Sequence, residues 1–315
     1  MDTVTRRGLM MRTAAMGLMV SAGIATKAAA KTSTVPLPAT ETVWLDRIAP
    51  AYSEGVTFGV PWPRGAVSAK SGFTLGEVPV QSWPIAYWPD GSLKWSAHAI
   101  GPQASAKISY PLVPGKPVVP AAPLSVSQSK DAFTIVAGDL SWIVPKSGKA
   151  LIASATRAGK SAMGAVTLAA LTQNAASLEE QPELRQTVFD GQVATAALEQ
   201  SGPVRAVIKL DGHHTDGTRQ WLPFTVRLYF YAGSEAVRIV HSFIFDGDET
   251  RDFIRGLAVK AQAPMTDELY NRHIRFSGQK DGVWGEAVRS LTGLRRDPGK
   301  AARAAQIAGK RVDPA

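Results

Sequence analysis

Apolar and polar residues alternate through most of the chain after residue 41, in stretches separated by Gly, Pro, Asp and Ser. Alternation with a period of two is typical of β-strands that bury one face, and these separators favour turns. The first stretches are short and aromatic, whereas those after residue 186 are longer. The pattern predicts an all-β protein: a small N-terminal barrel followed by an antiparallel β-sandwich, with a short C-terminal helix or tail.

The aromatic segment 80–98 gives the strongest local signal. Its Asp90-Gly91 pair lies between two apolar runs, and Gly91 can take a positive φ without steric cost, which predicts a β-hairpin. Just upstream, the prolines and glycines of segment 58–65 predict an extended strand with a sharp turn. We expect Trp83 and Trp95, inside strands, to fill the barrel. Exposed aromatic rings beside turns can stack on sugars, so the candidate substrate-binding residues here are Trp62, Arg64 and Trp88.

Changes in composition predict where the domains divide. Residues 113–123 are rich in proline, favour an extended polyproline geometry and mark a linker between a barrel at 41–112 and a sandwich at 124–293. Residues 294–315 are basic and contain an alanine-rich run, which predicts a helical or solvated tail. Residues 31–40 form a second, N-terminal linker.

Charge and cysteine content exclude several classes of function. The 315-residue chain contains no cysteine, so it has no disulfides, thiol nucleophiles or cysteine-ligated metal sites. Its net charge of +9 is concentrated at the two ends and not on the body. A nucleic-acid-binding domain carries its basic surface on the folded body, so we expect no nucleic-acid partner.

The first 30 residues have the features of an export signal. Arg6 and Arg7 precede a weakly apolar run of small residues, and Ala28-Ala29-Ala30 provides a cleavage site before Lys31. Paired arginines predict a twin-arginine signal peptide that engages the twin-arginine export machinery. A membrane anchor is disfavoured because the run is shorter than a bilayer-spanning helix. We therefore expect a mature protein that is periplasmic or secreted, with no membrane association after cleavage.

Several motifs together resemble the exo-acting rhamnogalacturonan lyase-like family. Segments 59–65, 79–81 and 88–95 are similar to its N-terminal barrel, and segments 202–206, 212–213, 227–234 and 241–248 to its central β-sandwich. The resemblance implies a polysaccharide lyase-like protein whose partner is an acidic polysaccharide. Members of the family continue into a C-terminal α/α toroid that this sequence lacks, so we expect either a fragment of a longer protein or the product of a gene that has lost its end.

Cleaving a uronate by β-elimination requires a base, a proton donor and a cation beside the carboxylate. The candidate catalytic residues are His213 and His214, placed in a loop between strands, and Tyr229. The alternative for the histidines is a solvated hairpin tip, because adjacent strand residues point to opposite faces. Arg227 and His241 are the candidate substrate-binding residues of the sandwich, expected to share or neighbour the sheet face of Tyr229. Amphipathic side chains covering that face are the alternative.

Alternatives also remain for the acidic turn, which could bind calcium, and for the function of the whole chain. We expect no cofactor, with calcium at Asp246, Asp248, Glu249 and Asp252 as the alternative to a solvated turn. The favoured hypothesis is the N-terminal portion of an exported lyase-like protein acting on a uronate-containing glycan such as rhamnogalacturonan. A non-catalytic carbohydrate-binding or assembly module is the second hypothesis. A periplasmic structural protein without a ligand is the third.

Overall fold

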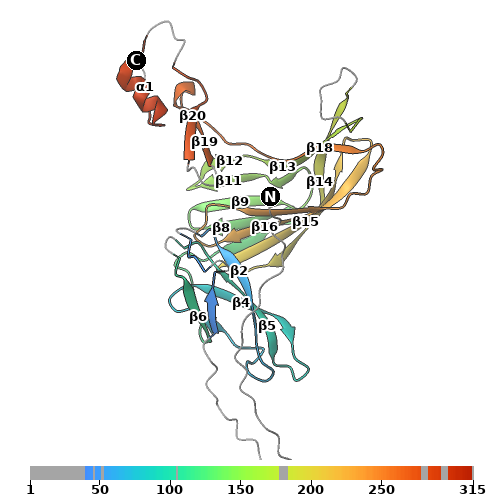
Figure 1. Cartoon of the computed structure of the whole chain (residues 1–315), viewed down its shortest axis with the longest axis vertical. Coiled ribbons are helices and arrows are strands. Elements are labelled where there is room, and N and C mark those ends of the chain that lie inside the picture. The colour runs from blue at the N-terminus through green and yellow to red at the C-terminus, as the bar shows by residue number, and fades with distance from the viewer. Residues whose placement is uncertain are drawn as a thin grey trace, which may run out of the picture.

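The computed structural model describes residues 40–44, 47–50, 53–103, 106–176, 184–277, 283–291 and 297–313. These residues form antiparallel sheets, with α1 (Gly299–Ile307) as the α-helix, so the predicted all-β class is confirmed (Figure 1). The expected signal peptide at 1–30 lies outside the described residues. None of the helices in the described ranges is both long and apolar enough to span a bilayer.

The N-terminal module is built from two three-stranded sheets. The first has the order β1 (Thr40–Val43), β6 (Ser109–Pro114) and β3 (Phe73–Thr74). The second has the order β2 (Val56–Pro61), β5 (Leu93–Ile100) and β4 (Val80–Tyr87). The predicted hairpin joins β4 to β5, with Gly91 at a φ of 81°. Buried side chains from both sheets form one core, among them Val60, Phe73, Leu93 and Leu112.

Two sheets stack to form the second module (Figure 1). The shorter sheet has the order β12 (Lys160–Met163), β11 (Ser154–Arg157), β9 (Leu140–Pro145), β8 (Ala132–Ala137) and β7 (Ser125–Gln128). The longer sheet contains β10 (Ala150–Ile152), β13 (Val166–Gln173), β14 (Gln186–Gln200), β15 (Arg205–Thr215), β16 (Gln220–Tyr231), β17 (Arg238–Phe243) and β18 (Phe253–Ala261).

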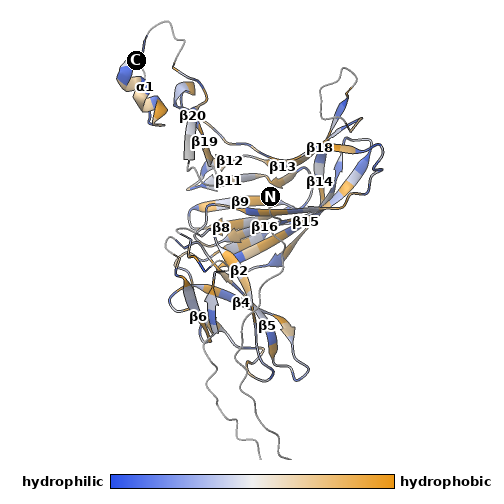
Figure 2. Ribbon diagram, in the orientation of Figure 1, coloured by the Kyte–Doolittle hydropathy of each residue, from blue (hydrophilic) through white to orange (hydrophobic). Residues whose placement is uncertain are grey.

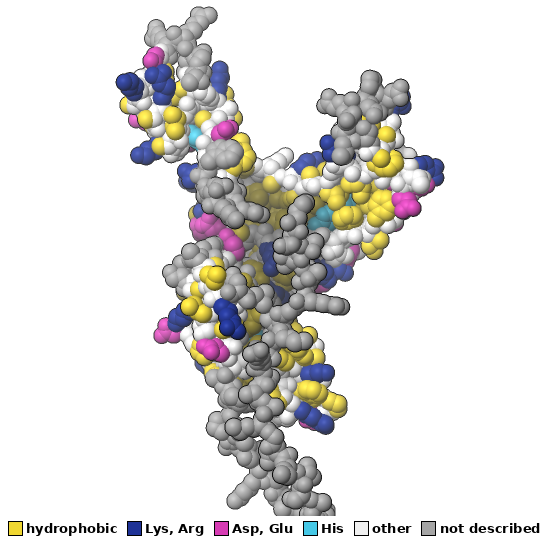
Figure 3. All heavy atoms as spheres, in the orientation of Figure 1, with side chains coloured by type: hydrophobic (Ala, Val, Ile, Leu, Met, Phe, Trp, Pro, Cys, Tyr) yellow, Lys and Arg dark blue, Asp and Glu magenta, His cyan; other side chains and the backbone are white. Residues whose placement is uncertain are grey.

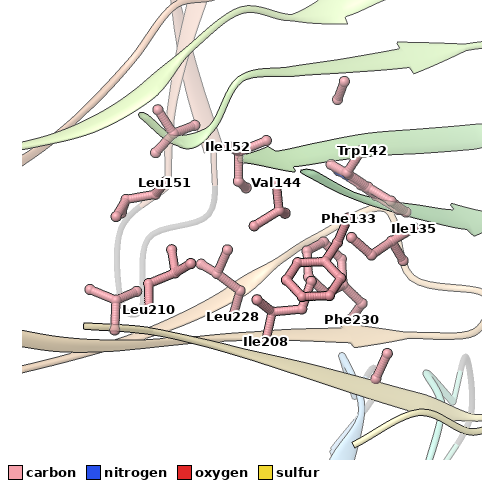
Figure 4. Close-up of a cluster of buried hydrophobic side chains, with 14 of the residues drawn as sticks. Phe133, Ile135, Trp142, Val144, Leu151, Ile152, Ile208, Leu210, Leu228 and Phe230 are labelled. Carbon is pink, nitrogen blue, oxygen red and sulfur yellow. The ribbon is translucent and has the colours of Figure 1, made fainter. Parts of the chain in front are cut away.

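The core lies between these two sheets, as the predicted alternation requires. In β16, Phe224, Val226, Leu228 and Phe230 are buried at alternate positions. They meet side chains of the short sheet, and Figure 4 shows Phe230 near Trp142 and Phe133. Figure 2, coloured by hydropathy, shows apolar and polar residues mixed along the long strands. Each large apolar side chain buried in this way stabilises the fold by roughly 1.5–3 kcal/mol.

The two faces of the long sheet have different environments. We call the face that packs on the short sheet the inner face, and the opposite one the outer face. Strands β14, β15 and β16 have 15, 11 and 12 residues, whereas those of the short sheet have 4 to 6. The inner face therefore continues past the edge of the short sheet, where β14 to β16 extend to the right in Figure 1.

The barrel is joined to the outer face at the start of β15. The side-chain oxygen Oε1 of Gln81 accepts hydrogen bonds from the backbone N–H groups of Val204 and Arg205, at 3.0 and 2.8 Å. A Cβ atom on Gly202 would overlap the Gln81 amide. Glycine at position 202 therefore lets the barrel approach closely, and the contact fixes β4 next to the outer face.

A small unit follows β18. It contains η1 (Leu269–Asn271), the hairpin of β19 (His273–Ser277) and β20 (Val283–Ala287), and helix α1. The buried side chain of Gln306 in α1 accepts a hydrogen bond from Leu291 N and donates one to the carbonyl oxygen of Arg289. These bonds attach the basic helix to the segment that follows the hairpin.

Candidate functional site

A cleft of about 240 Å³ opens where the barrel meets the outer face of the long sheet. Strand β4 contributes Trp83, and strands β14, β15 and β16 contribute the rest: Glu199, Gln200, Arg205, Val207 and Tyr229. Val207 is paired with Tyr229 across the strands, and Arg205 lies two residues before Val207 on β15, so all three share the outer face. We call this site the Arg205 cleft. It combines aromatic rings with a few polar groups, as ligand pockets commonly do.

Arg205 is the most unusual residue of the cleft. Only 8% of it is exposed, and its guanidinium lies between two rings, with Cζ 4.4 Å from the centroid of Trp83 and 5.5 Å from that of Tyr229. Nε donates to Gln200 Oε1 at 2.7 Å, and Nη1 donates to Thr57 Oγ1 at 2.6 Å. Both partners are neutral, whereas a buried arginine is normally paired with an anion.

Other charges surround the cleft. Glu199 is held by Arg227 through two hydrogen bonds of 2.7 and 2.9 Å, and these bonds raise the pKa of Arg227. The guanidinium of Arg238 lies 5.8 Å from the centroid of Tyr229. Among the residues that line the cleft, the carboxylate of Glu199 is already paired with Arg227, whereas the guanidinium of Arg205 has no anionic partner. The Arg205 cleft is therefore electrostatically suited to an anionic ligand.

We expected Tyr229, Arg227 and His241 to share or neighbour one sheet face, and this holds for two of the three. Tyr229 and Arg227 do share the outer face, two residues apart on β16. His241 pairs with Val226, an inner-face residue, so its side chain lies on the opposite side of the sheet. The prediction for His241 was wrong because the register between β16 and β17 could not be read from the alternation within each strand.

His213 and His214 lie inside β15 and not in the loop where we expected them. They point to opposite faces, as neighbours in a strand must. His214 is fully buried on the inner face, where its Nδ1 lies 2.9 Å from the carbonyl oxygen of Leu222. Burial lowers the pKa of His214, and burial likewise lowers that of His241. Neither histidine lines the Arg205 cleft.

The barrel candidates do not form the exposed surface that we expected. Trp62 is only 4% exposed and stacks on Phe73, so the prediction of an accessible ring was wrong: Trp62 belongs to the barrel core. Trp88 is half-buried, with its Nε1 donating to the carbonyl oxygen of Trp62 and Lys94 Nζ lying 4.7 Å from its ring centroid. Arg64 is exposed and pairs with Asp90 of the hairpin at 3.1 Å.

Trp83 was also predicted incorrectly. It was expected in the barrel core, but its ring lies in the Arg205 cleft against the guanidinium. Arg205 itself was missed. A sequence signal existed: an arginine within the apolar run Val204-Arg-Ala-Val-Ile-Lys209 interrupts a strand that is otherwise suited to burial. Its position between two rings from different modules was not accessible from sequence.

The acidic turn uses its carboxylates within the protein. Asp252 forms a bidentate pair with Arg219 at 2.6 and 2.7 Å, and Asp246 accepts from the backbone N–H of Leu222 at 2.7 Å. Asp248 pairs with Arg251 at 2.8 Å. Hydrogen bonds from Thr250 lower the pKa of Asp248 to about 2. Within the described ranges, no group of three or more acidic or histidine side chains is placed to hold a metal ion.

Comparison with known proteins gives two family matches. Residues 38–115 match the PcRGLX-like N-terminal RIFT barrel domain, and residues 124–315 match the PcRGLX-like protein central beta sandwich domain. The chain is also 32% identical over 254 residues to the uncharacterized protein YetA of Bacillus subtilis strain 168. That alignment covers 78% of this chain and 29% of YetA, so the chain spans less than a third of the length of this relative.

Proposed function

Because this chain belongs to the exo-rhamnogalacturonan lyase-like (PcRGLX-like) family, we propose that it is the N-terminal portion of a lyase acting on a uronate-containing glycan such as rhamnogalacturonan. Cleavage would proceed by β-elimination. The Arg205 cleft is the site that we assign to the glycan. The observation that carries this assignment is the buried guanidinium of Arg205, whose two hydrogen-bond partners in the described part of the chain are neutral.

A uronate would supply the negative charge that is missing beside Arg205. Its carboxylate carries the negative charge that a desolvated guanidinium requires, and arginine binds carboxylates through two parallel N–H groups. Its ring presents apolar C–H edges to the aromatic surfaces of Trp83 and Tyr229. The ion pair of Glu199 with Arg227 leaves the cleft without an uncompensated negative charge that would repel the ligand.

The proposed reaction needs two proton transfers. A base removes the proton on C5 of the uronate, the electron pair forms the C4–C5 double bond, and the C4–O bond breaks as its oxygen takes up a proton. Arg205 neutralises the carboxylate and so stabilises the negative charge that develops next to C5. Tyr229 is the cleft residue whose phenol can carry a proton at this position.

Two measurements on the purified chain test this proposal. Incubation with rhamnogalacturonan should raise the ultraviolet absorbance of the unsaturated product, and affinity electrophoresis should retard the chain in a gel containing acidic polysaccharide. Retardation without product would support binding and contradict catalysis by this portion alone. Absence of both would contradict the proposal.

One observation favours a second candidate, a non-catalytic carbohydrate-binding module. The residues that line the Arg205 cleft include a tyrosine but no histidine: His214 and His241 lie on the other side of the sheet, and His213 is not among the lining residues. A site of this kind can bind an acidic sugar without moving its protons. The absorbance measurement separates this candidate from the first.

Export is part of the proposal. The paired Arg6 and Arg7 and the small-residue run that follows support recognition by the twin-arginine export machinery. We place the mature protein in the periplasm or outside the cell, where polysaccharides are accessible. Replacing both arginines by lysine should keep the precursor in the cytoplasm, as fractionation and immunoblotting would report. Export of the doubly substituted precursor would contradict this route.

A further inference from the structure

A second arginine lies beside the aromatic ring at one side of the Arg205 cleft. Arg238 of β17 is the cross-strand partner of Tyr229, and its guanidinium carbon lies 5.8 Å from the centroid of that ring. Arg205 of β15 approaches the same ring, with its guanidinium carbon 5.5 Å from the centroid. Because β16 lies between β15 and β17, the two guanidiniums reach Tyr229 from strands on opposite sides of it.

These two arginines share the lack of a carboxylate partner. Strands β14 to β17 together contain four lysines and arginines. Lys209 and Arg227 are each paired with a carboxylate, at 2.9 and 2.7 Å. The other two are Arg205 and Arg238, and neither takes part in an ion pair within the described part of the chain. The cations of these strands that lack a counter-charge are thus the two beside Tyr229.

Cations are also neutralised at the far end of the long strands. There Arg219 pairs with Asp252 at 2.6 Å, and Arg251 pairs with Asp248 at 2.8 Å. Figure 3 shows acidic and basic side chains next to one another at this end of the molecule. Within β14 to β17, the uncompensated arginines therefore lie at the end of the strands that meets the barrel.

A ligand can reach both guanidiniums. Arg238 is exposed, and Arg205, although only 8% exposed, lines the cleft of about 240 Å³. Gln200 and Thr57 accept hydrogen bonds from Nε and Nη1 of Arg205, and no described residue accepts one from Nη2. Nη2 is nevertheless not one of the buried nitrogens that lack a partner in this part of the chain, so it keeps accessible surface. Its N–H groups are therefore open to a ligand in the cleft.

The arrangement of the two arginines suits a ligand with more than one anionic group. Strands two places apart in a sheet are separated by roughly 9–10 Å, so the backbones that carry Arg205 and Arg238 lie this far apart, with Tyr229 between them. Each arginine can bind a carboxylate through two parallel N–H groups, and cations without a counter-charge attract anions to a cleft. An oligosaccharide of uronates carries several carboxylates on one chain and can supply one to each arginine.

We propose that Arg238 forms a second carboxylate-binding position, so that this site recognises a glycan with at least two uronate residues. One uronate binds Arg205 in the cleft, and another binds Arg238 on the far side of Tyr229. This inference rests on the function proposed for the Arg205 cleft and adds to it the number of acidic residues that the site recognises. Arg238 is then a specificity-determining residue, because it favours oligomers that carry several carboxylates over a single uronate.

Titration calorimetry with galacturonate and tetragalacturonate tests the proposal, with competition against the tetramer where the monomer binds weakly. The tetramer presents carboxylates at several spacings, and its four residues give a statistical advantage of only about fourfold at a single site. We expect it to bind at least about twentyfold more tightly than the monomer. Arg238→Gln should weaken binding of the tetramer at least about tenfold and change that of the monomer by less than about twofold. The control Arg255→Gln removes the same charge from an exposed position on β18 and should change neither affinity.

The two ligands also separate failure of this inference from failure of the proposed function. If tetragalacturonate does not bind, or if Arg205→Lys leaves its affinity unchanged, the glycan site at the Arg205 cleft is wrong and the second position fails with it. If Arg205→Lys weakens both ligands but Arg238→Gln leaves tetramer binding unchanged, the cleft stands and the second position is overturned. Equal weakening of monomer and tetramer by Arg238→Gln would also overturn it, because a second carboxylate position acts on the oligomer alone.

Discussion

The guanidinium carbon of Arg205 in the sandwich lies 4.4 Å from the ring centroid of Trp83 in the barrel. This contact brings a cation from one module against an aromatic ring from the other, at the cleft that we assign to the glycan. Neither module alone forms the site. The attachment of the barrel to the long sheet is therefore as important for the proposed function as the residues of the cleft.

Arg205→Lys tests the role of the planar guanidinium. Lysine keeps the positive charge but cannot stack between two rings or bind a carboxylate through two parallel N–H groups. We expect about tenfold weaker binding of tetragalacturonate by titration calorimetry. The control is Arg255→Lys, an exposed arginine on β18, which should bind as the unsubstituted chain does. Equal loss in both variants would show that the loss does not arise from the guanidinium of Arg205 in the cleft.

Tyr229→Phe separates binding from proton transfer. The ring that faces Arg205 remains, so affinity for the acidic glycan should change by less than about threefold. The phenol is lost, and formation of unsaturated product should fall by about 10²-fold or more, the range that a positioned acid or base contributes. Tyr87→Phe, in the exposed part of β4, is the matched control. Full activity of the Tyr229 variant would exclude Tyr229 as the proton carrier.

Gln81→Leu should weaken the junction between the modules. Leucine removes the acceptor for the backbone N–H groups of Val204 and Arg205, and each unsatisfied group costs roughly 1–3 kcal/mol where it is buried. We expect a lower midpoint of thermal unfolding and weaker acidic-glycan binding together. The exposed Gln128→Leu is the control. Gly202→Ala, whose added methyl group overlaps the same amide, should reproduce both effects; loss of stability without loss of binding would contradict the link between junction and cleft.

The barrel should lose stability in acid through His98. This fully buried ring lies between the hydroxyls of Ser82 and Ser96, and burial lowers the pKa of His98 from 6.5 to about 4. The unfolded chain therefore binds a proton at a higher pH than the folded one does. The stabilisation is present above pH 6.5 and is lost as the pH falls towards 4, a change of about 3 kcal/mol in the free energy of unfolding.

The variant His98→Gln checks this attribution. Glutamine can hydrogen-bond to both serines and does not titrate, so the acid-induced loss should be smaller in the variant by about the amount assigned to His98. Urea unfolding at pH 7 and at about pH 4.5 measures the difference. Identical acid sensitivity of the two proteins would show that other groups cause it.

Sequence reasoning predicted the parts of this fold that depend on local pattern. The Asp90-Gly91 hairpin, the long alternating strands and the helix near residue 299 are each specified by nearby residues. The errors concern relations between strands. His241 was assigned to the wrong face because register depends on the partner strand, and Trp83 was assigned to the core because its neighbour Arg205 is distant in sequence. The arginine within an apolar run could be seen in the sequence. Its burial between two rings with only neutral hydrogen-bond partners could not be predicted from the sequence.

A crystal structure of the chain with tetragalacturonate tests the central claim most directly. We predict a uronate carboxylate within hydrogen-bonding distance of the Arg205 guanidinium, with its sugar ring beside Trp83 or Tyr229. A ligand found instead at Arg64 and Trp88 of the barrel hairpin, or an empty Arg205 cleft at saturating ligand, would contradict this account.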